Sequence, residues 1–220
     1  MDRLDERLEK HVELLIQRYP SIKLIKDNII SAYFMMEKCY ERNGKLLIAG
    51  NGGSASDSEH MAAELMKSFK ALRRVNKEFA GRLQYIDEKK GKFLADCLEY
   101  ALPAIPLVSQ GALITAYLND VGWEGIFAQQ ILGYGNAGDV FLGVSTSGNS
   151  ENIINAAITA KAMGIGVIAL TGKKGGQLAD FADIAVRVPE EETYVIQELH
   201  LPIYHCWCLM LEEKYFGKMN

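Results

Sequence analysis

Four side chains that could transfer protons or bind a metal ion occur at helical spacing in two separate parts of the chain. His60 and Glu64 are four residues apart, and Gln197 and His205 are eight residues apart. On an α-helix both spacings place the two side chains on one face. A carboxylate and an imidazole in an enclosed site can serve as general base and general acid. Each pair alone is also compatible with a surface contact or a satisfied polar group in the core.

Two glycine- and hydroxyl-rich segments each follow a short apolar run and precede a helical pattern. They are residues 50–54 (Gly-Asn-Gly-Gly-Ser) after the run 45–49, and residues 145–150 (Ser-Thr-Ser-Gly-Asn-Ser) after the run 139–144. Neither carries a basic side chain, so a phosphate there would be held by backbone N–H groups, hydroxyls and a helix N-terminus. The missing Gly-Lys-Ser/Thr excludes a P-loop nucleotide hydrolase. His60 and Glu64 follow the first segment, so the start of their helix fixes their distance from the bound anion.

A third glycine-rich segment, residues 171–176, follows the apolar run 167–170. Repeated units of strand, loop and helix predict an α/β fold, here a doubly wound five-stranded parallel sheet flanked by helices, with its ligand at the carboxyl ends of the strands. We expect one domain over residues 1–220, with a further strand at 104–108 whose Pro106 indicates an edge position. The expected helices cover residues 3–18, 22–42, 55–69, 150–163 and 194–216.

Residues 1–43 form additional N-terminal helices in this interpretation. Two amphipathic helices before the first strand are more than one face of a sheet requires. We therefore expect another subunit to cover part of their apolar surface.

The composition excludes several classes of protein. The chain is 49% hydrophobic and 24% charged, as is usual for a globular protein. No apolar run approaches the roughly 18 to 20 residues that a membrane span needs, and the charged start lacks a signal-peptide core. The four cysteines have no CxxC spacing, so reduced thiols are expected. These features predict a cytoplasmic protein without a membrane partner.

The net charge of −4 is unevenly distributed. Residues 67–92 contain nine basic and three acidic side chains, which gives +6 for this segment and −10 for the rest of the chain. Such a run is either a solvated helical face or a surface that attracts an anionic substrate or partner. We predict that residues 70–102 form a basic helical insertion over the mouth of an active site, its own or a neighbour's. In this hypothesis Arg73, Arg74 and Lys77 help to steer the substrate.

Four ordered motifs resemble those of the phosphoheptose isomerase family, which belongs to the sugar isomerase (SIS) superfamily. The resemblance covers about residues 40–215 and is interrupted by the segment 70–102. The motifs run from Gly50 to Glu64, from Ser145 to Ser150, from Leu170 to Gly176 and from Thr193 to His205.

The resemblance implies an aldose–ketose isomerase that converts sedoheptulose 7-phosphate to D-glycero-manno-heptose 7-phosphate through an enediol. It makes Glu64 and His205 catalytic, and it implies a zinc ion held by His60, Glu64, Gln197 and His205. It also implies a homotetramer with active sites at subunit interfaces, and no nucleic-acid partner. The substrate-binding residues that it implies are Asn51, Gly52, Gly53, Ser54, Asn119, Asp120, Ser145, Thr146, Ser147, Ser150, Thr193 and Gln197.

Several alternatives stay open on the residues alone. Glu64 is either the base or a metal ligand, because a carboxylate bound tightly to a metal is a poorer base. The chain also departs from the family by its long insertion and by Ser68, where an arginine is often found. The rivals are a non-catalytic scaffold like the one that associates with the replication initiator DnaA, a sugar-phosphate-sensing module of a regulator, and an isomerase of another sugar phosphate such as arabinose 5-phosphate.

Overall fold

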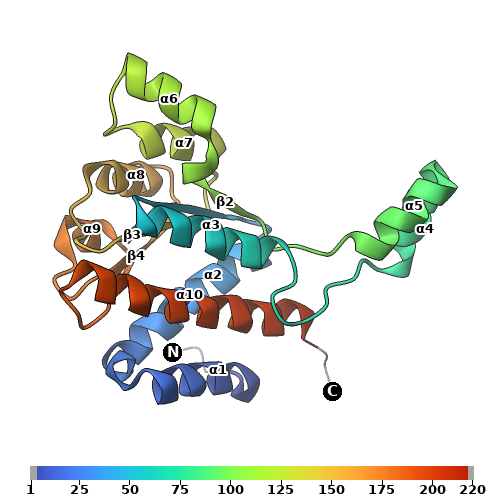
Figure 1. The fold of residues 1–220 in the computed structure, drawn as a ribbon, viewed down its shortest axis with the longest axis horizontal. Helices are drawn as coiled ribbons and strands as arrows, with labels where there is room; N and C mark the ends of the chain where they lie inside the picture. Colours follow the sequence, from blue (N-terminus) through green and yellow to red (C-terminus); the bar gives the residue numbers. More distant parts are fainter. Residues whose placement is uncertain (1–3, 218–220) are drawn as a thin grey trace.

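A single parallel sheet forms the centre of the computed structural model, which describes residues 4–217 (Figure 1). Its five strands lie in the order β2-β1-β3-β4-β5 and pair in parallel throughout. The strands are β1 (Leu46–Gly50), β2 (Ala104–Pro106), β3 (Val140–Ser145), β4 (Gly166–Thr171) and β5 (Ile184–Arg187). The doubly wound sheet is confirmed, and so is the edge position of the strand that ends at Pro106.

Alternate strand residues enter two separate cores, which explains why the strands are almost continuously apolar. On β1, Leu46 and Ile48 belong to one core, whereas Leu47 and Ala49 belong to the other. The first core lies against α1, α2, α3 and α10, and the second lies against α7, α8 and α9. Both faces of the sheet are therefore covered by helices (Figure 1).

The helices have the following bounds. They are α1 (Glu6–Arg18), α2 (Lys26–Glu41), α3 (Gly53–Met66), α4 (Lys77–Ile86), α5 (Glu88–Cys97), α6 (Gly111–Asp120), α7 (Ile126–Tyr134), α8 (Glu151–Ala162), α9 (Gly176–Phe181) and α10 (Thr193–Phe216), with 3₁₀ turns at Pro20–Ile25 and Leu107–Ser109. None of the helices within residues 4–217 is long and apolar enough to cross a membrane.

The N-terminal helices bury most of their apolar stripe inside their own chain. Leu8, Val12 and Leu15 of α1 are buried in the same core as α10, and α2 packs between the sheet and α10. The 24-residue α10 offers α1 a long apolar face. Leu14 and Leu24 remain exposed, at 49% and 81%, and cover of this remaining apolar surface by another subunit stays a prediction.

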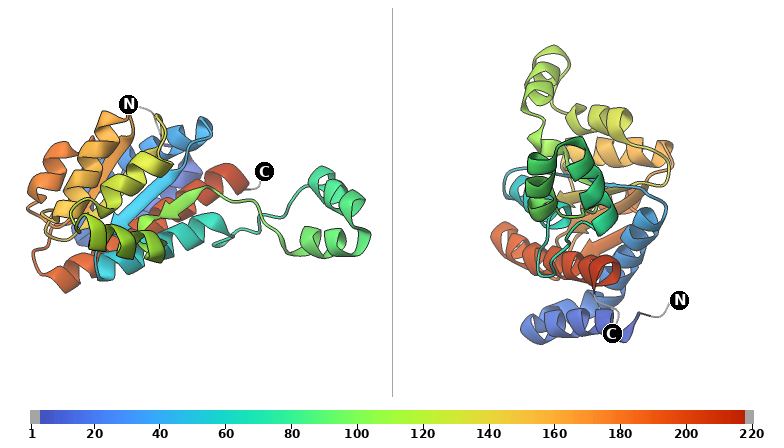
Figure 2. Two further views of the ribbon diagram at one scale, coloured as in Figure 1. Left: turned by 90° about the horizontal axis from the view of Figure 1, so that it is seen from above. Right: turned by 90° about the vertical axis from the view of Figure 1, so that its right-hand side faces the viewer.

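The insertion forms a helical arm that points away from the body of the molecule. Its helices α4 and α5 pack against each other, and Figures 1 and 2 show them extending beyond the end of α10. Among the described side chains α4 buries none, and Gly91 is the buried residue of α5, where an added Cβ would collide with the carbonyl of Leu83. Helix and loop are confirmed for residues 70–102. The arm leads outward, and its place over the mouth of an active site, its own or a neighbour's, stays a prediction.

The base of the arm is fixed by a buried ion pair. Arg73 is 2% exposed, and its guanidinium lies 2.9 Å from the carboxylate of Glu212 on α10. Glu212 also accepts hydrogen bonds from the backbone N–H groups of Phe69, Lys70 and Ala71, each at 2.8 Å. Arg73 is therefore a structural anchor and not a steering residue on the surface, which corrects the sequence-based hypothesis.

Candidate active site

Three loops meet at the carboxyl ends of neighbouring strands. Gly50 at the end of β1 is level with Val144 of β3, and Ser145 at the end of β3 is level with Thr171 of β4. The amides of Asn51 and Asn152 exchange two hydrogen bonds, at 2.9 and 3.0 Å, which tie the first loop to the start of α8. The predicted phosphate loops thus lie side by side, at the edge where ligands of such sheets bind.

The loop 145–150 has a defined shape. The hydroxyl of Ser145 accepts a hydrogen bond from the N–H of Gly148 at 3.2 Å and lies 3.0 Å from the hydroxyl of Ser150. Gly148 has a φ of +65° and packs so closely on the backbone of Gly175 that no side chain would fit. Ser147 is exposed, and its hydroxyl accepts from the N–H of Asn149 at 3.1 Å. A rigid loop that presents hydroxyls beside a helix start suits an anionic group.

The first loop passes directly into α3. Gly52, with a φ of +57°, precedes the first helical residue Gly53, and Ser54 in the first turn is 3% exposed. A Cβ on Gly53 would lie 2.7 Å from Nε2 of Gln197, so the Gln197 side chain lies directly over this helix start. The start of α3 and the Gln197 side chain of α10 are therefore in close contact.

His60, Glu64 and His205 gather further along the same two helices. Nε2 of His60 lies 3.3 Å from Oε1 of Glu64, whose other oxygen lies 2.9 Å from Nζ of Lys67. The rings of His60 and His205 meet edge to face with centroids 5.0 Å apart. His60 and Glu64 on α3 therefore face His205 on α10 across the contact of the two helices.

His205 is held as a neutral imidazole. Burial lowers its pKa, and the neighbouring His60 lowers it further. Its Nε2 is buried without a hydrogen-bond partner among the described residues. The ring of Phe69 packs against the His205 ring, with the two centroids 5.2 Å apart. An unpartnered ring nitrogen beside a carboxylate can accept or pass on a proton, or bind a cation.

No three His, Cys, Asp or Glu side chains within residues 4–217 are arranged as a ready metal site. Gln197 lies over the start of α3, whereas His205 lies beside His60, two turns further along. The predicted four-ligand set is therefore divided between two ends of one helix pair.

The remaining predicted substrate residues make no contact that assigns them a role. Asn119 and Asp120 end α6, are exposed, and share a side-chain hydrogen bond of 2.8 Å. Thr193 is the exposed first residue of α10, and Thr146 accepts at its carbonyl from the N–H of Gly172 at 3.0 Å. These assignments stay predictions.

Sequence reasoning missed two side chains that organise the site. Asn152, which is 5% exposed, links the two phosphate loops, and its place two residues after Ser150 is the only signal that could have indicated it. Tyr204, which is 2% exposed, lies between His60 and Asp57 and directly precedes His205.

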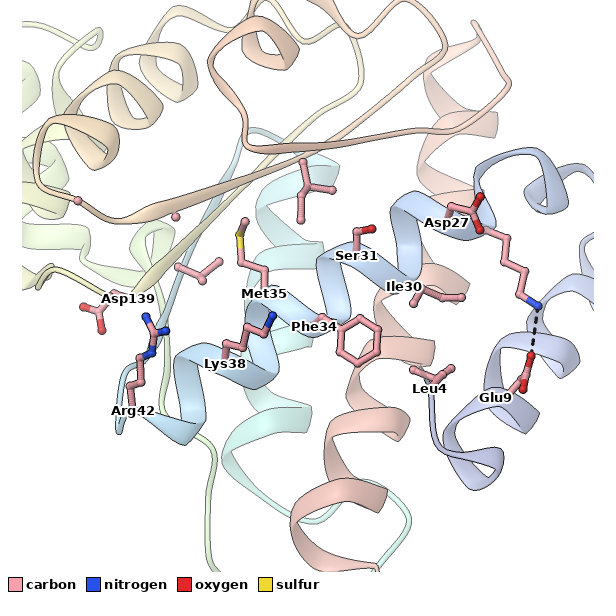
Figure 3. A pocket seen from close by; sticks show the side chains of 16 residues that line it. Leu4, Glu9, Asp27, Ile30, Ser31, Phe34, Met35, Lys38, Arg42 and Asp139 are labelled. Carbon is pink, nitrogen blue, oxygen red and sulfur yellow. Dashed lines mark ion pairs between the residues drawn. The ribbon is translucent and has the colours of Figure 1, made fainter. Parts of the chain in front are cut away.

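A large cavity of about 780 Å³ lies at the amino ends of the strands, on the side of the sheet away from the phosphate loops. Phe34, Met35 and Lys38 of α2 line one side of it, and Asp139 and Gly166, at the amino ends of β3 and β4, line another (Figure 3). The phosphate loops are at the carboxyl ends of the same strands. We therefore place the candidate active site at the loops and not in this larger cavity, because ligands of open α/β sheets bind beyond the carboxyl ends.

The fold is a doubly wound α/β domain with its loops clustered at one end of the strands, and residues 94–172 match the family model of the SIS domain. A phosphoheptose isomerase of Sulfurimonas denitrificans is 36% identical over 214 residues, which cover 97% of this chain and 96% of that protein. The chain belongs to the phosphoheptose isomerase family, and hence to the isomerases.

Solved structures agree with this assignment. A phosphoheptose isomerase from Francisella tularensis superimposes with a TM-score of 0.74 and 32% identity, covering 94% of this chain and 97% of that one. The phosphoheptose isomerase of Neisseria gonorrhoeae gives a TM-score of 0.71 at 32% identity, covering 94% and 98% of the two chains. The comparisons favour the enzyme over the scaffold and regulator alternatives.

Proposed function

We propose that this protein interconverts sedoheptulose 7-phosphate and D-glycero-manno-heptose 7-phosphate. The observation that carries the proposal is the placement of His60, Glu64 and His205 on helices that begin beside the phosphate loops. The substrate phosphate binds at the loops, which leaves the sugar to extend along α3 toward these three side chains. The test is an assay of the purified protein against a panel of ketose phosphates that includes the arabinose 5-phosphate and ribulose 5-phosphate pair. Activity confined to a pentose phosphate would overturn the heptose assignment.

The reaction moves a carbonyl group from C2 to C1 and needs one proton transfer between carbons and one between oxygens. Glu64 removes a proton from C1 to give an enediol and returns it to C2. His205, neutral at pH 7, moves the proton between the two oxygens.

A divalent ion fits the donor types of the site. The imidazoles of His60 and His205, with Glu64, are ordinary zinc ligands, and the buried Nε2 of His205 has no other partner among the described residues. Gln197 would complete the set after its side chain turns from the start of α3. A bound zinc ion would polarise the substrate carbonyl and stabilise charge on the enediolate oxygens.

We predict one zinc ion per site in protein purified without chelators. Elemental analysis, paired with activity before and after chelation, measures this. Loss of activity on chelation and its return on adding zinc would support a catalytic metal. Full activity with no detectable metal would leave acid–base catalysis by Glu64 and His205 as the mechanism.

Ser147→Ala is expected to raise KM more than it lowers kcat. The Ser147 hydroxyl is exposed at the phosphate loop, and a contact of equal strength in ground and transition states contributes only to binding. Steady-state kinetics on the preferred sugar phosphate measure the two constants. Thr159→Ser on α8 is a suitable control, since its hydroxyl bonds the carbonyl of Asn155 inside the helix. A fall in kcat alone would contradict a uniform binding role.

We further propose a homotetramer with active sites at subunit interfaces, in which the arm reaches a neighbour's site. The arm carries much of the basic charge of residues 67–92 and leaves Tyr85, Ile86 and Phe93 exposed, at 93%, 82% and 68%. Exposed large apolar side chains on a projecting helix pair favour contact with another protein surface.

Neutralising Arg74, Lys77 and Lys89 together is expected to lower kcat/KM mainly at low ionic strength. Basic side chains near a site attract a phosphate dianion, and salt screens this attraction. The measurement is kcat/KM across a salt series, with Lys10, Lys23 and Arg42 neutralised as the control on the exposed surface of the N-terminal elements. Parallel salt curves for both triple variants would contradict steering by the arm.

A further inference from the structure

Tyr204 connects two polar side chains of α3 from its position on α10. Its hydroxyl lies 3.0 Å from Nδ1 of His60 and 3.3 Å from Oδ1 of Asp57. The tyrosine ring is 2% exposed and packs edge to face on both His60 and His205, with centroids 5.6 and 5.0 Å apart. The ring is thus locked in place, and its hydroxyl has a fixed direction.

The phenol has one proton to donate and two neighbours that could accept it. Oδ2 of Asp57 is buried without a hydrogen-bond partner among the described residues. Among those residues, the Tyr204 hydroxyl is the one donor to this carboxylate, through Oδ1. If Tyr204 turned its proton toward His60, both oxygens of Asp57 would lack a donor. Leaving the Asp57 carboxylate without a donor costs more free energy than changing the hydrogen bond of His60, because the imidazole can carry its own proton on Nδ1 and donate it to the Tyr204 oxygen.

The resulting chain runs in one direction. His60 donates from Nδ1–H to the Tyr204 oxygen, and Tyr204 donates to Asp57. Nε2 of His60 then carries a lone pair, and it points to Oε1 of Glu64 at 3.3 Å. Two acceptors at this distance repel each other unless a proton or a cation lies between them.

We infer that Tyr204, held by Asp57, is a positioning residue that fixes His60 as the Nδ1–H tautomer and turns its Nε2 toward Glu64. This inference rests on the proposed function, because it is the zinc or proton chemistry of that site which needs a defined Nε2. Ligating histidines commonly donate their second ring N–H to a neighbouring acceptor, which sets the tautomer and the ring orientation.

The tautomer can be measured in the metal-free protein without any turnover. Nitrogen-15 NMR of the labelled imidazoles distinguishes a protonated from an unprotonated ring nitrogen, and His60→Gln identifies the His60 signals among the four histidines. We expect Nδ1 of His60 to be protonated and to donate to Tyr204, with any second proton of the ring on Nε2, facing Glu64. A proton found on Nε2, with Nδ1 unprotonated, would overturn the inference whatever the protein's activity.

Tyr204→Phe keeps the ring packing and removes only the hydroxyl. We expect a mixture of His60 tautomers and an affinity for zinc that is about 10- to 100-fold weaker, the usual effect of losing such a supporting contact. Competition against a chromophoric chelator measures the affinity. Asp57→Asn should likewise abolish the preference for one His60 tautomer, because a neutral amide accepts the phenol proton less strongly than a carboxylate does.

Tyr215→Phe is the matched control, since its hydroxyl donates to the carbonyl of Glu37 at 2.9 Å, in a different part of α10. It should leave the tautomer and the zinc affinity unchanged. An unchanged tautomer and affinity in Tyr204→Phe would refute the positioning role. If wild-type protein binds no zinc, the metal part of the proposed function fails, while the tautomer of His60 still decides this inference.

Discussion

Replacing Glu64 with glutamine is expected to lower the turnover of ketose phosphate by about 100-fold or more, whether Glu64 is the base or a metal ligand. Glutamine keeps the size of the side chain and can still contact Lys67, but it cannot accept a proton from carbon. Glu64 is largely buried, with its side chain 13% exposed, so water has little room to replace it. Steady-state kinetics with the preferred sugar phosphate give the ratio directly.

Glu13→Gln is the control for this substitution. Glu13 is exposed on α1, so its replacement by glutamine is the same chemical change made outside the site. Its kinetics should match those of the wild type. Turnover of Glu64→Gln within a few-fold of wild type would exclude Glu64 both as base and as an essential ligand.

Glu212→Gln is expected to destabilise the protein by about 3–5 kcal/mol, because it leaves the buried Arg73 without a counter-charge. The side chains of Arg73 and Glu212 are 0% and 3% exposed, so water cannot solvate the cation that remains. Urea unfolding, followed by circular dichroism, measures the change. The arm should separate from α10 first, since the same carboxylate accepts from the backbone of Phe69, Lys70 and Ala71.

Glu213→Gln tests whether burial is the cause. Glu213 is the next residue on α10, and its ion pair with Arg7, at 3.6 Å, is partly exposed. Such a pair contributes less than about 1 kcal/mol, so the Glu213 variant should unfold close to wild type. Equal losses for the two variants would contradict the anchoring role of Glu212.

The pH dependence of stability should follow the same carboxylate. Burial alone would raise the pKa of Glu212, but its three backbone donors and Arg73 together hold the pKa below the ordinary value. A depressed pKa in the folded state contributes stability above the unfolded pKa of about 4.3, and this contribution is lost as the pH falls through the folded pKa. The free-energy difference between wild type and Glu212→Gln should therefore shrink below about pH 4.

The sheet and its ligand-binding edge could be predicted from the sequence because their signals are local. An apolar run that ends in a glycine- and serine-rich loop specifies a buried strand and its carboxyl end, as at Gly50 and Ser145. Pro106 likewise indicated an edge strand, because proline has no backbone N–H to donate to a neighbouring strand. Helical spacing placed His60 beside Glu64, and the fold brought His205 to them, whereas Gln197 lies over the start of α3.

What the sequence could not indicate depends on contacts between distant segments. In the sequence, Arg73 is one of several charges in a basic run. Its burial depends on the ion pair with Glu212, which lies 139 residues later in the chain. The direction of the arm follows from that anchor and not from its own helices. Similarly, Tyr204 reads as an apolar position of α10 until α3 places Asp57 and His60 against its hydroxyl.

The most direct test of the isomerase account is the conversion of sedoheptulose 7-phosphate in deuterated water, followed by NMR. Proton transfer through an enediol predicts that the aldose product carries solvent deuterium at C2, because a proton held by Glu64 can exchange with the solvent. Glu64→Gln should form neither the aldose nor the deuterated carbon at a comparable rate. No conversion by the wild type, or conversion by Glu64→Gln at the wild-type rate, would contradict the account.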